Sequence, residues 1–190
     1  MARKSLRENF VEAGEEQFHI LGYNRAGVKA IADAAHAPKG SFYNHFESKE
    51  ALAVVAIERY GLTRGIEGLL DTSVDPLQRL RDHFRSLRDE NIGYDFRRGC
   101  LVGGLAVEAA DASEVVRQAA GAAFAGWRDA IASAVADAQR AGLVPQTCEA
   151  DTLARFILNA WEGALIAARV ERSARPYEVF FTVVFDTVLR

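Results

Sequence analysis

At 190 residues, the chain is long enough for one large domain or two small ones. Hydrophobic residues make up 49% and charged residues 26%, as in an ordinary globular protein, and the net charge of −3 argues against a uniformly basic one. Two cysteines are too few for a disulfide scaffold, and no uncharged apolar run approaches the roughly 20 residues of a membrane helix. The first residues lead into a Glu-rich amphipathic segment without a signal-peptide core, so we expect a cytoplasmic chain with free thiols.

After a predicted first helix over residues 5–21, the stretch 22–52 carries the pattern of a helix-turn-helix. Apolar residues at helical spacing over 28–35 form one face of a first short helix. Pro38 has the fixed φ that suits the start of a second helix. In a helix-turn-helix, this second helix enters the major groove of DNA.

The second helix has an inner and an outer face. Phe42 and Phe46 are one turn apart and are expected to point inward, which leaves donor-rich side chains outside. Such donors are what phosphate oxygens and base edges require. Between His36 and His45 the chain has a lysine, two histidines and no carboxylate, so the acidic net charge is only weak evidence against DNA binding.

With these motifs, the segment resembles the DNA-binding domain of the tetracycline-repressor (TetR) family of bacterial transcription regulators. The resemblance rests on Gly22-Tyr23, on Val28-x-x-Ile31-Ala32, on the run KGSFYNHF over 39–46, and on Ser48-Lys49-Glu50-x-Leu52. It implies a helix-turn-helix DNA-binding domain over residues 1–47 and a helical regulatory and dimerisation domain over residues 48–190. The implied function is that of a homodimeric repressor, released from a palindromic operator by a signal in the second domain.

The family's motif also implies roles for single residues. Its tyrosine and lysine, here Tyr43 and Lys49, hold the operator backbone, and His45 would assist. Asn44 is a candidate for reading bases because an Asn amide pairs with adenine. The full set expected to contact DNA is Lys29, Lys39, Ser41, Tyr43, Asn44, His45 and Lys49. The alternative is a solvated helix with ordinary polar residues.

Two departures from the family's pattern leave a second hypothesis open. Arg25-Ala26 stand where the family commonly has a Ser or Thr cap, and His36-Ala37 stand where it usually has Gly-Val in the turn. Histidine is enriched at positive φ, so the turn can still form. The second hypothesis is a helical small-molecule or redox-binding protein whose domain over residues 1–47, here called the head, no longer reads DNA.

Helical spacing continues to the end of the chain and predicts an all-α fold of about nine helices. A helix over 49–70 would link the head to the rest of the chain, here called the body. Asp75-Pro76 is a typical N-terminal signal for a charged helix that would run to about residue 90. The remaining helices are expected over about 100–108, 113–141, 149–172 and 176–189. No catalytic motif, metal-ligand spacing or cofactor loop is present, so we expect neither an enzyme nor a cofactor.

A seam of small residues in the last two helices predicts a dimer interface. Two copies would form a four-helix bundle about a two-fold axis. The residues expected there are Phe156, Ala160, Gly163, Ala164, Ala167, Phe180 and Val184. The alternative is that both helices are buried within one subunit.

The body offers two candidates for the signal. Aromatic residues in Ala-rich surroundings, which are Phe84, Tyr94, Phe96, Phe124 and Trp127, could line a cavity for a small apolar ligand or simply pack in the core.

The second candidate is Cys100, which follows two arginines at a predicted helix start, a position that favours the thiolate. Its surroundings resemble the family branch of the N-ethylmaleimide-reductase repressor, where the matching cysteine senses electrophiles. The alternative is an inert core cysteine.

Overall fold

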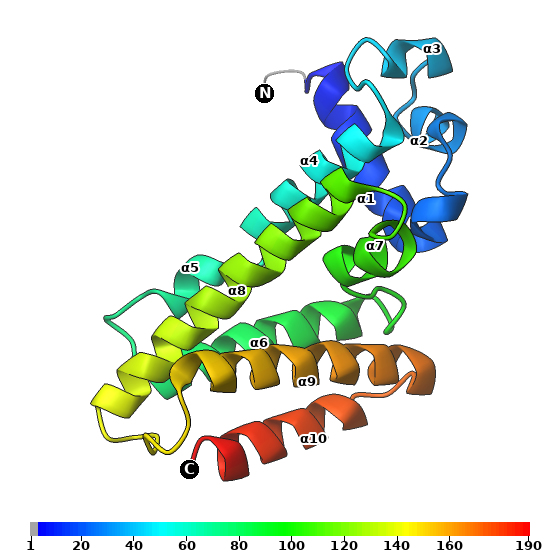
Figure 1. Ribbon diagram of the computed structural model, residues 1–190. Coiled ribbons are helices and arrows are strands. Elements are labelled where there is room, and N and C mark those ends of the chain that lie inside the picture. The colour runs from blue at the N-terminus through cyan, green and yellow to red at the C-terminus, as the bar shows by residue number, and fades with distance from the viewer. Residues whose placement is uncertain (1–3) are drawn as a thin grey trace. The chain divides into compact units, whose positions relative to one another are not determined.

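The computed structural model of the protein describes residues 4–190; residues 1–3, with which the predicted DNA-binding domain begins, lie outside the described residues. Ten α-helices and a short π-helical segment make up the described part, which contains no strand (Figure 1). The predicted all-α fold is confirmed. No helix within residues 4–190 is long and apolar enough to cross a bilayer.

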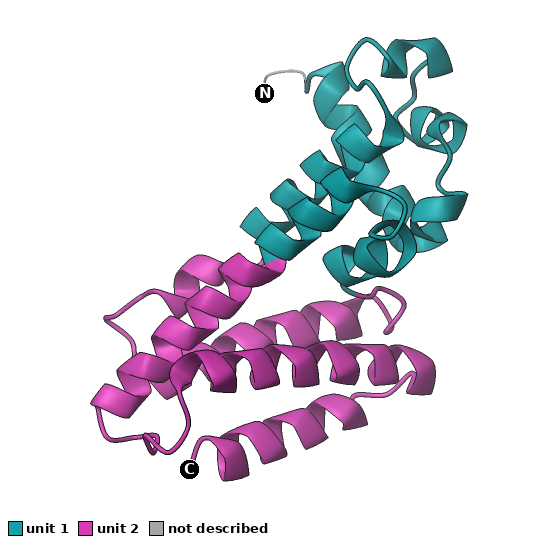
Figure 2. Ribbon diagram, in the orientation of Figure 1, with its two compact units in different colours: residues 1–62, 100–123 teal, residues 63–99, 124–190 magenta. Residues whose placement is uncertain are grey.

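The chain divides into two compact units, each built from two stretches of sequence (Figure 2). Unit 1 contains the described residues up to Leu62 together with Cys100–Ala123, and unit 2 contains Thr63–Gly99 and Phe124–Arg190. The helices of unit 1 are α1 (Leu6–Arg25), α2 (Val28–Ala34), α3 (Lys39–Phe42), α4 (Lys49–Leu62), α7 (Leu101–Ala109) and the first part of α8 (Glu114–Arg140). Unit 2 has the rest of α8 with α5 (Ile66–Leu69), α6 (Pro76–Gly93), α9 (Ala150–Glu171), α10 (Arg175–Val183) and the π-helical η1 (Val184–Val188). The boundary between residues 47 and 48 stays a prediction.

Side-chain caps fix several helix starts. Ser5 Oγ accepts from the backbone N–H of Glu8, whose carboxylate accepts in return from the Ser5 N–H, so α1 opens with a capping box. The Asp75 carboxylate accepts from the Gln78 N–H at 2.9 Å and Pro76 is the first residue of α6, as the sequence predicts.

The predicted helix over 49–70 is wrong as a single element. α4 ends at Leu62, and α5 is a separate short helix over Ile66–Leu69. Gly65 between them has a φ of 65°, in the left-handed region that glycine adopts without steric cost and that no helix interior allows. The apolar spacing of this stretch is helical on both sides of the glycine, which is why periodicity alone did not reveal the break.

The core of unit 2 is a cluster of stacked and edge-to-face rings. Phe84 on α6 lies with its ring centroid 5.0 Å from those of Trp161 on α9 and Phe180 on α10. Trp161 also stacks on Tyr177 at 5.1 Å. Such pairs add to the free energy of burying large apolar surfaces. The cluster therefore fixes α6, α9 and α10 against one another.

Candidate functional site

The short helix α3 is held on α1 by three phenylalanines. The Phe42 ring meets the Phe10 ring edge-to-face, with centroids 5.5 Å apart, and the Phe46 centroid lies 5.5 Å from that of Phe42. All three side chains are buried, so the predicted inward orientation of Phe42 and Phe46 is confirmed. A helix of four residues has little stability of its own, and these contacts fix its position.

The turn between α2 and α3 forms despite the missing glycine. His36 adopts a φ of 53°, and its N–H donates to the Asp33 carbonyl at 3.1 Å. The Ala37 N–H donates to the Ala32 carbonyl at 2.9 Å. This pair of bonds is a Schellman motif, which closes the C-terminus of α2 and turns the chain toward α3. The expectation that His36 accommodates positive φ is confirmed.

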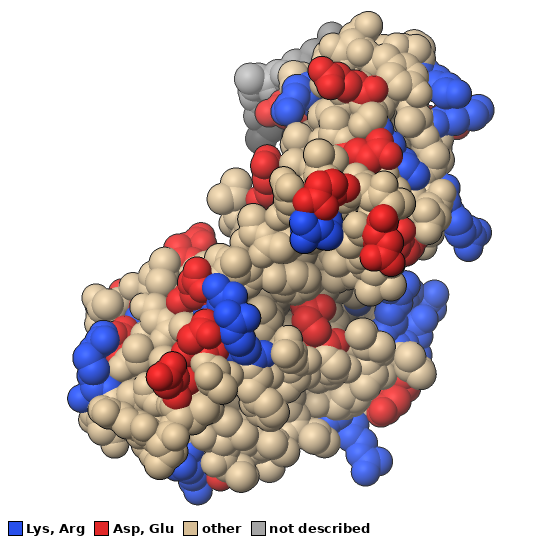
Figure 3. All heavy atoms as spheres, viewed as in Figure 1, with Lys and Arg blue, Asp and Glu red and all other residues tan. Residues whose placement is uncertain are grey.

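The outer face of α3 and the turn after it presents a polar surface. Lys39, Tyr43 and Asn44 are exposed, with the Tyr43 side chain 56% accessible. Gly40 leaves open space, since no atom beyond its chain neighbours and the backbone of its own helix lies within 4 Å of a Cβ built on it. In Figure 3, basic side chains project from the edge of the molecule that carries α2 and α3. The structure therefore brings together a lysine, a phenol and an amide on one exposed face.

Ser41 and His45 lie at the margin of this face. Both are half-buried; Ser41 Oγ donates to the Pro38 carbonyl at 2.6 Å, and the His45 ring centroid is 5.8 Å from that of Phe10. Lys29 on α2 forms an ion pair with Asp33, at 2.6 Å between Nζ and Oδ2, but both side chains are largely exposed. Exposed pairs of this kind contribute about 0–1 kcal/mol, so a phosphate can replace the aspartate at little cost.

The Lys49 side chain points toward α1 and not toward the exposed face formed by Lys39, Tyr43 and Asn44. Its Nζ donates to the Tyr23 carbonyl at 2.8 Å and lies 4.0 Å from the centroid of the Tyr23 ring. Burial, and then the nearby Glu50 carboxylate, raise the pKa of the Tyr23 phenol to about 12, so the ring beneath Lys49 is neutral at physiological pH. A phosphate contact by Lys49 stays a prediction, and it would replace the bond to Tyr23.

Cys100 caps the N-terminus of α7. Its Sγ accepts from the Gly103 N–H at 3.3 Å, and the side chain is half-buried. The two arginines before it have partners within unit 2: Arg97 Nε lies 3.1 Å from Asp95 Oδ2, and the Arg98 guanidinium lies 3.8 Å from the centroid of the Tyr94 ring. A role of Cys100 as a sensor stays a prediction.

The five aromatic residues expected around a ligand lie in different environments. Phe84 and Trp127 pack together in the ring cluster of unit 2, with centroids 6.5 Å apart. Tyr94 is exposed, whereas Phe96 and Phe124 are half-buried. Two hollows on unit 2, of about 710 and 370 Å³, are lined by other residues. A cavity lined by all five aromatic residues stays a prediction.

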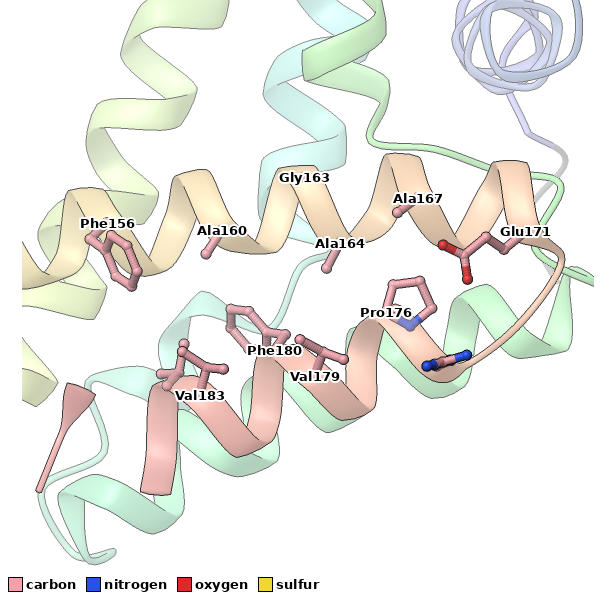
Figure 4. Close-up of a pocket in the computed structure, with 12 residues that line it drawn as sticks. Phe156, Ala160, Gly163, Ala164, Ala167, Glu171, Pro176, Val179, Phe180 and Val183 are labelled. Carbon is pink, nitrogen blue, oxygen red and sulfur yellow. The ribbon is translucent and has the colours of Figure 1, made fainter. Parts of the chain in front are cut away.

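The larger hollow is an apolar groove along α9 and α10 (Figure 4). All seven residues expected at a dimer interface line it, which are Phe156, Ala160, Gly163, Ala164, Ala167, Phe180 and Val184. Phe180 and Val184 are buried beneath it, whereas Phe156 remains 48% exposed. Beside it, Ile166 and Val170 on α9 are 65% and 78% exposed. Apart from Glu171 and Arg175, the lining is apolar, so one face of the two helices is largely apolar and uncovered in the single chain.

The structure adds one residue to the DNA-binding head that the sequence did not assign. Glu108 on α7 accepts a hydrogen bond from the Asn24 N–H at 2.9 Å, at the junction of α1 and α2. The two residues are 84 positions apart. The only signal in the sequence is a carboxylate at the end of the short apolar helix after Cys100, and no local pattern reports its partner.

Comparison with known proteins agrees with this architecture. Residues 10–56 match the model described as "Bacterial regulatory proteins, tetR family", and residues 76–184 match "Tetracyclin repressor-like, C-terminal domain". The HTH-type transcriptional repressor DhaR of Mycobacterium sp. (strain GP1) is 36% identical, over 100% of this chain and 95% of its own length.

Solved structures of similar proteins cover nearly the whole chain. A regulatory protein TetR from Rhodobacter sphaeroides superposes with a TM-score of 0.87 at 33% identity, over 95% of this chain and 97% of that one. The reduced form of E. coli NemR superposes with a TM-score of 0.84 at 25% identity, over 97% of this chain and 98% of that one.

Proposed function

Because the chain belongs to the tetR family of bacterial regulatory proteins, we propose that it is a homodimeric, cytoplasmic transcriptional repressor rather than an enzyme. Two copies of the head would bind the halves of a palindromic operator, about one DNA turn apart. A signal received by the rest of the chain would release the operator. The observation that carries this proposal is the exposed polar face of α3, held by the three phenylalanines behind it.

The chemistry of that face supports contact with a duplex. Lys39 supplies a cation for a phosphate, and the Tyr43 hydroxyl is a neutral donor to the same backbone. The Asn44 amide has the donor and acceptor that pair with adenine in the major groove. In this proposal Ser41, His45 and Lys29 add contacts at the margin, and Lys49 adds one after leaving Tyr23.

The test replaces two of these residues together. Lys39→Ala with Tyr43→Phe should weaken binding to a labelled duplex from directly upstream of the chain's own coding sequence by about 100-fold, at roughly 1–2 kcal/mol for each lost contact. Arg117→Ala is the matched control, because it removes an equal charge from the exposed surface of α8. Equal affinity of the double variant and the control would contradict the assignment of this face, and no binding by the wild type would favour the hypothesis of a head that no longer reads DNA.

The apolar groove along α9 and α10 supports the homodimer. A four-helix bundle from two copies would cover Phe156 and the exposed side chains beside the groove. Ala160→Glu would place a charge in that interface and should give monomers in analytical ultracentrifugation. Ser133→Glu adds the same charge to the exposed side of α8 and should remain dimeric. A dimeric Ala160→Glu variant would show that this groove is not the interface.

Two classes of inducer remain, a reversible small molecule and an electrophile that modifies Cys100. The similarity to NemR, whose solved structure is a reduced form, supports the second class. The position of Sγ as the cap of α7 gives modification a physical effect, because an alkyl group on the sulfur would crowd the Gly103 N–H from which Sγ accepts. Cys100→Ser should keep the protein on DNA after treatment with N-ethylmaleimide. Release of the Cys100→Ser variant would instead point to Cys148, and a wild-type protein that stays on DNA after the treatment would favour a pocket ligand.

A further inference from the structure

The junction between α1 and α2 contains a break in the helical backbone. Gly22 interrupts α1 with a φ of 76° and a ψ of 171°, and the residues after it form a new turn that ends where the Ala26 N–H donates to the Gly22 carbonyl at 3.1 Å. The N–H groups that open a new turn have no acceptor within the helix. They take their acceptors from water or from elsewhere in the fold, and only an acceptor of the fold can hold the turn in place.

Glu108 provides that acceptor. Its Oε2 accepts from the Asn24 N–H at 2.9 Å. The carboxylate also occupies the space beside Gly22, because a Cβ built on Gly22 would lie 2.2 Å from Glu108 Oε1. Any side chain at position 22 would displace the carboxylate, so the glycine is required both by its φ and by this close approach.

The position of Glu108 is set by the packing of α7. Leu101, Leu105 and Ala109 are almost fully buried, and α7 packs against both α1 and α4. The opposite side of the helix is open, with Val107 87% exposed. Glu108 lies one residue further on, half-buried, at the end of a helix whose backbone is fixed. A movement of α7 would therefore move the carboxylate with it.

The same junction leads directly into the helix-turn-helix. Ala26 is fully buried, and the Ile31 N–H of α2 donates to the Gly27 carbonyl at 3.1 Å. Lys49, at the start of α4, donates to the Tyr23 carbonyl one residue before Asn24. In the protein without DNA, two charged side chains from outside α1 thus hold adjacent residues at the point where the chain enters α2.

We propose that Glu108 is a positioning residue for DNA binding, through which α7 sets the orientation of α2 and α3. This inference rests on the proposed function and adds to it the contact that links α7 to the head. Glu108 does not touch DNA; it holds the Asn24 N–H, and so keeps the turn after Gly22 in the geometry from which α2 starts. A residue with a merely local capping role would affect stability and leave operator affinity unchanged.

The experiment measures two quantities in the full-length protein. The first is the exchange rate of the Asn24 amide hydrogen without DNA, and the second is the affinity for the labelled duplex from upstream of the coding sequence. Glu108→Ala should speed exchange and weaken DNA binding by about tenfold each, as expected for loss of a hydrogen bond to a charged acceptor. Glu108→Gln keeps an acceptor oxygen and should recover both to within about threefold. Val107→Ala, the neighbouring exposed position, is the control and should change neither.

The outcomes separate this inference from the proposed function. Wild-type affinity of Glu108→Ala, or unchanged exchange at Asn24, would overturn the positioning role while leaving the repressor intact. Failure of the wild-type protein to bind the duplex would contradict the proposed function and this inference with it. If Glu108→Ala does not fold, Glu108→Asp replaces it: the carboxylate is kept but shortened by one methylene, and both effects of the alanine variant are expected.

Discussion

The cores of the two units differ in what they bury beside their apolar side chains. In unit 1 the head is held by the rings of Phe10, Phe42 and Phe46. In unit 2 the ring cluster is accompanied by buried polar groups: the three polar or charged residues buried within residues 4–190 are Arg79, His83 and Asn91, and all belong to α6. The head is therefore specified by shape and apolar surface, whereas α6 depends on having the right hydrogen-bond partners.

Each buried group of α6 has a partner on another segment of unit 2. Arg79 donates to the Leu69 carbonyl at 2.9 Å and pairs with Asp137 of α8 at 2.6 Å. His83 accepts from Trp127 Nε1 at 2.8 Å. Asn91 Oδ1 accepts from the Tyr177 hydroxyl of α10 at 2.9 Å, and Asn91 Nδ2 donates to the Arg98 carbonyl. Partners of this kind specify an arrangement because a buried group left without one is costly.

The largest expected effect tests the apolar core of the head in unit 1. Phe42→Ala should lower the free energy of unfolding by about 3–5 kcal/mol, because it leaves a cavity beneath α3. Far-UV circular dichroism in urea measures it. Both tryptophans, Trp127 and Trp161, lie in unit 2, so their fluorescence follows that unit separately. We expect the fluorescence midpoint to move less than the dichroism midpoint; equal shifts would show that the loss is not local to the head.

The next effect tests whether buried charges act in pairs. Arg79→Met should cost about 3 kcal/mol, because Asp137 lies in a largely buried site, loses its buried partner and keeps only the exposed Arg140. Combining it with Asp137→Leu removes both charges and should recover at least half of the loss. Urea unfolding followed by tryptophan fluorescence gives both values. A double variant less stable than Arg79→Met would show that the charge left on Asp137 is not the cause of the lost stability.

A third effect is the pH dependence of the free energy of unfolding that His83 causes in unit 2. Burial, with a smaller contribution from the charge of Arg64, lowers the pKa of His83 to about 4, while the unfolded chain keeps a pKa near 6.5. The unfolded state therefore takes up this proton first, and stability falls as the pH drops from about 6.5 to about 4. The loss between pH 7 and pH 5 should be about 2 kcal/mol.

Its measurement uses the tryptophan that contacts the histidine. Trp127 donates to His83, so its fluorescence reports the loss of that contact directly. His83→Gln removes the titrating group, and the pH slope of its unfolding free energy between 7 and 5 should be smaller than that of the wild type. Parallel slopes would mean that His83 is not the neutral buried group described above.

The smallest effect concerns the bond between α10 and α6. Tyr177→Phe removes the hydroxyl that donates to Asn91 and should cost about 1–2 kcal/mol, since the amide oxygen stays buried without this donor. Phe181→Tyr on the same helix adds a hydroxyl at a half-buried position and serves as the reference for a change of one oxygen. A Tyr177→Phe variant as stable as the wild type would show that water satisfies the amide.

Most of the head could be predicted from the sequence, because its determinants are local. The spacing of Phe42 and Phe46, the proline before α3 and the tolerance of His36 for positive φ all act within a few residues. The groove of α9 and α10 was also predictable, since small residues at helical spacing mark one face of a helix.

What could not be predicted depends on contacts between distant residues. The sequence predicts α6 as a charged helix, and nothing near Arg79 reveals that Asp137, 58 positions later, makes its burial possible. Glu108 and Asn24 are a similar case within unit 1. The break before α5 cannot be predicted for a different reason: a glycine in a helical pattern shows its φ only in the folded chain.

The most direct test of the central claim compares two duplexes of equal length, one from directly upstream of the chain's own coding sequence and one with the same bases in shuffled order. Fluorescence anisotropy at fixed salt gives both affinities. A sequence-specific repressor should prefer the upstream duplex by about 10³-fold or more, with protein bound in multiples of two chains. Equal affinity for the two duplexes, or no binding to either, would contradict the assignment of the α3 face as a reader of DNA.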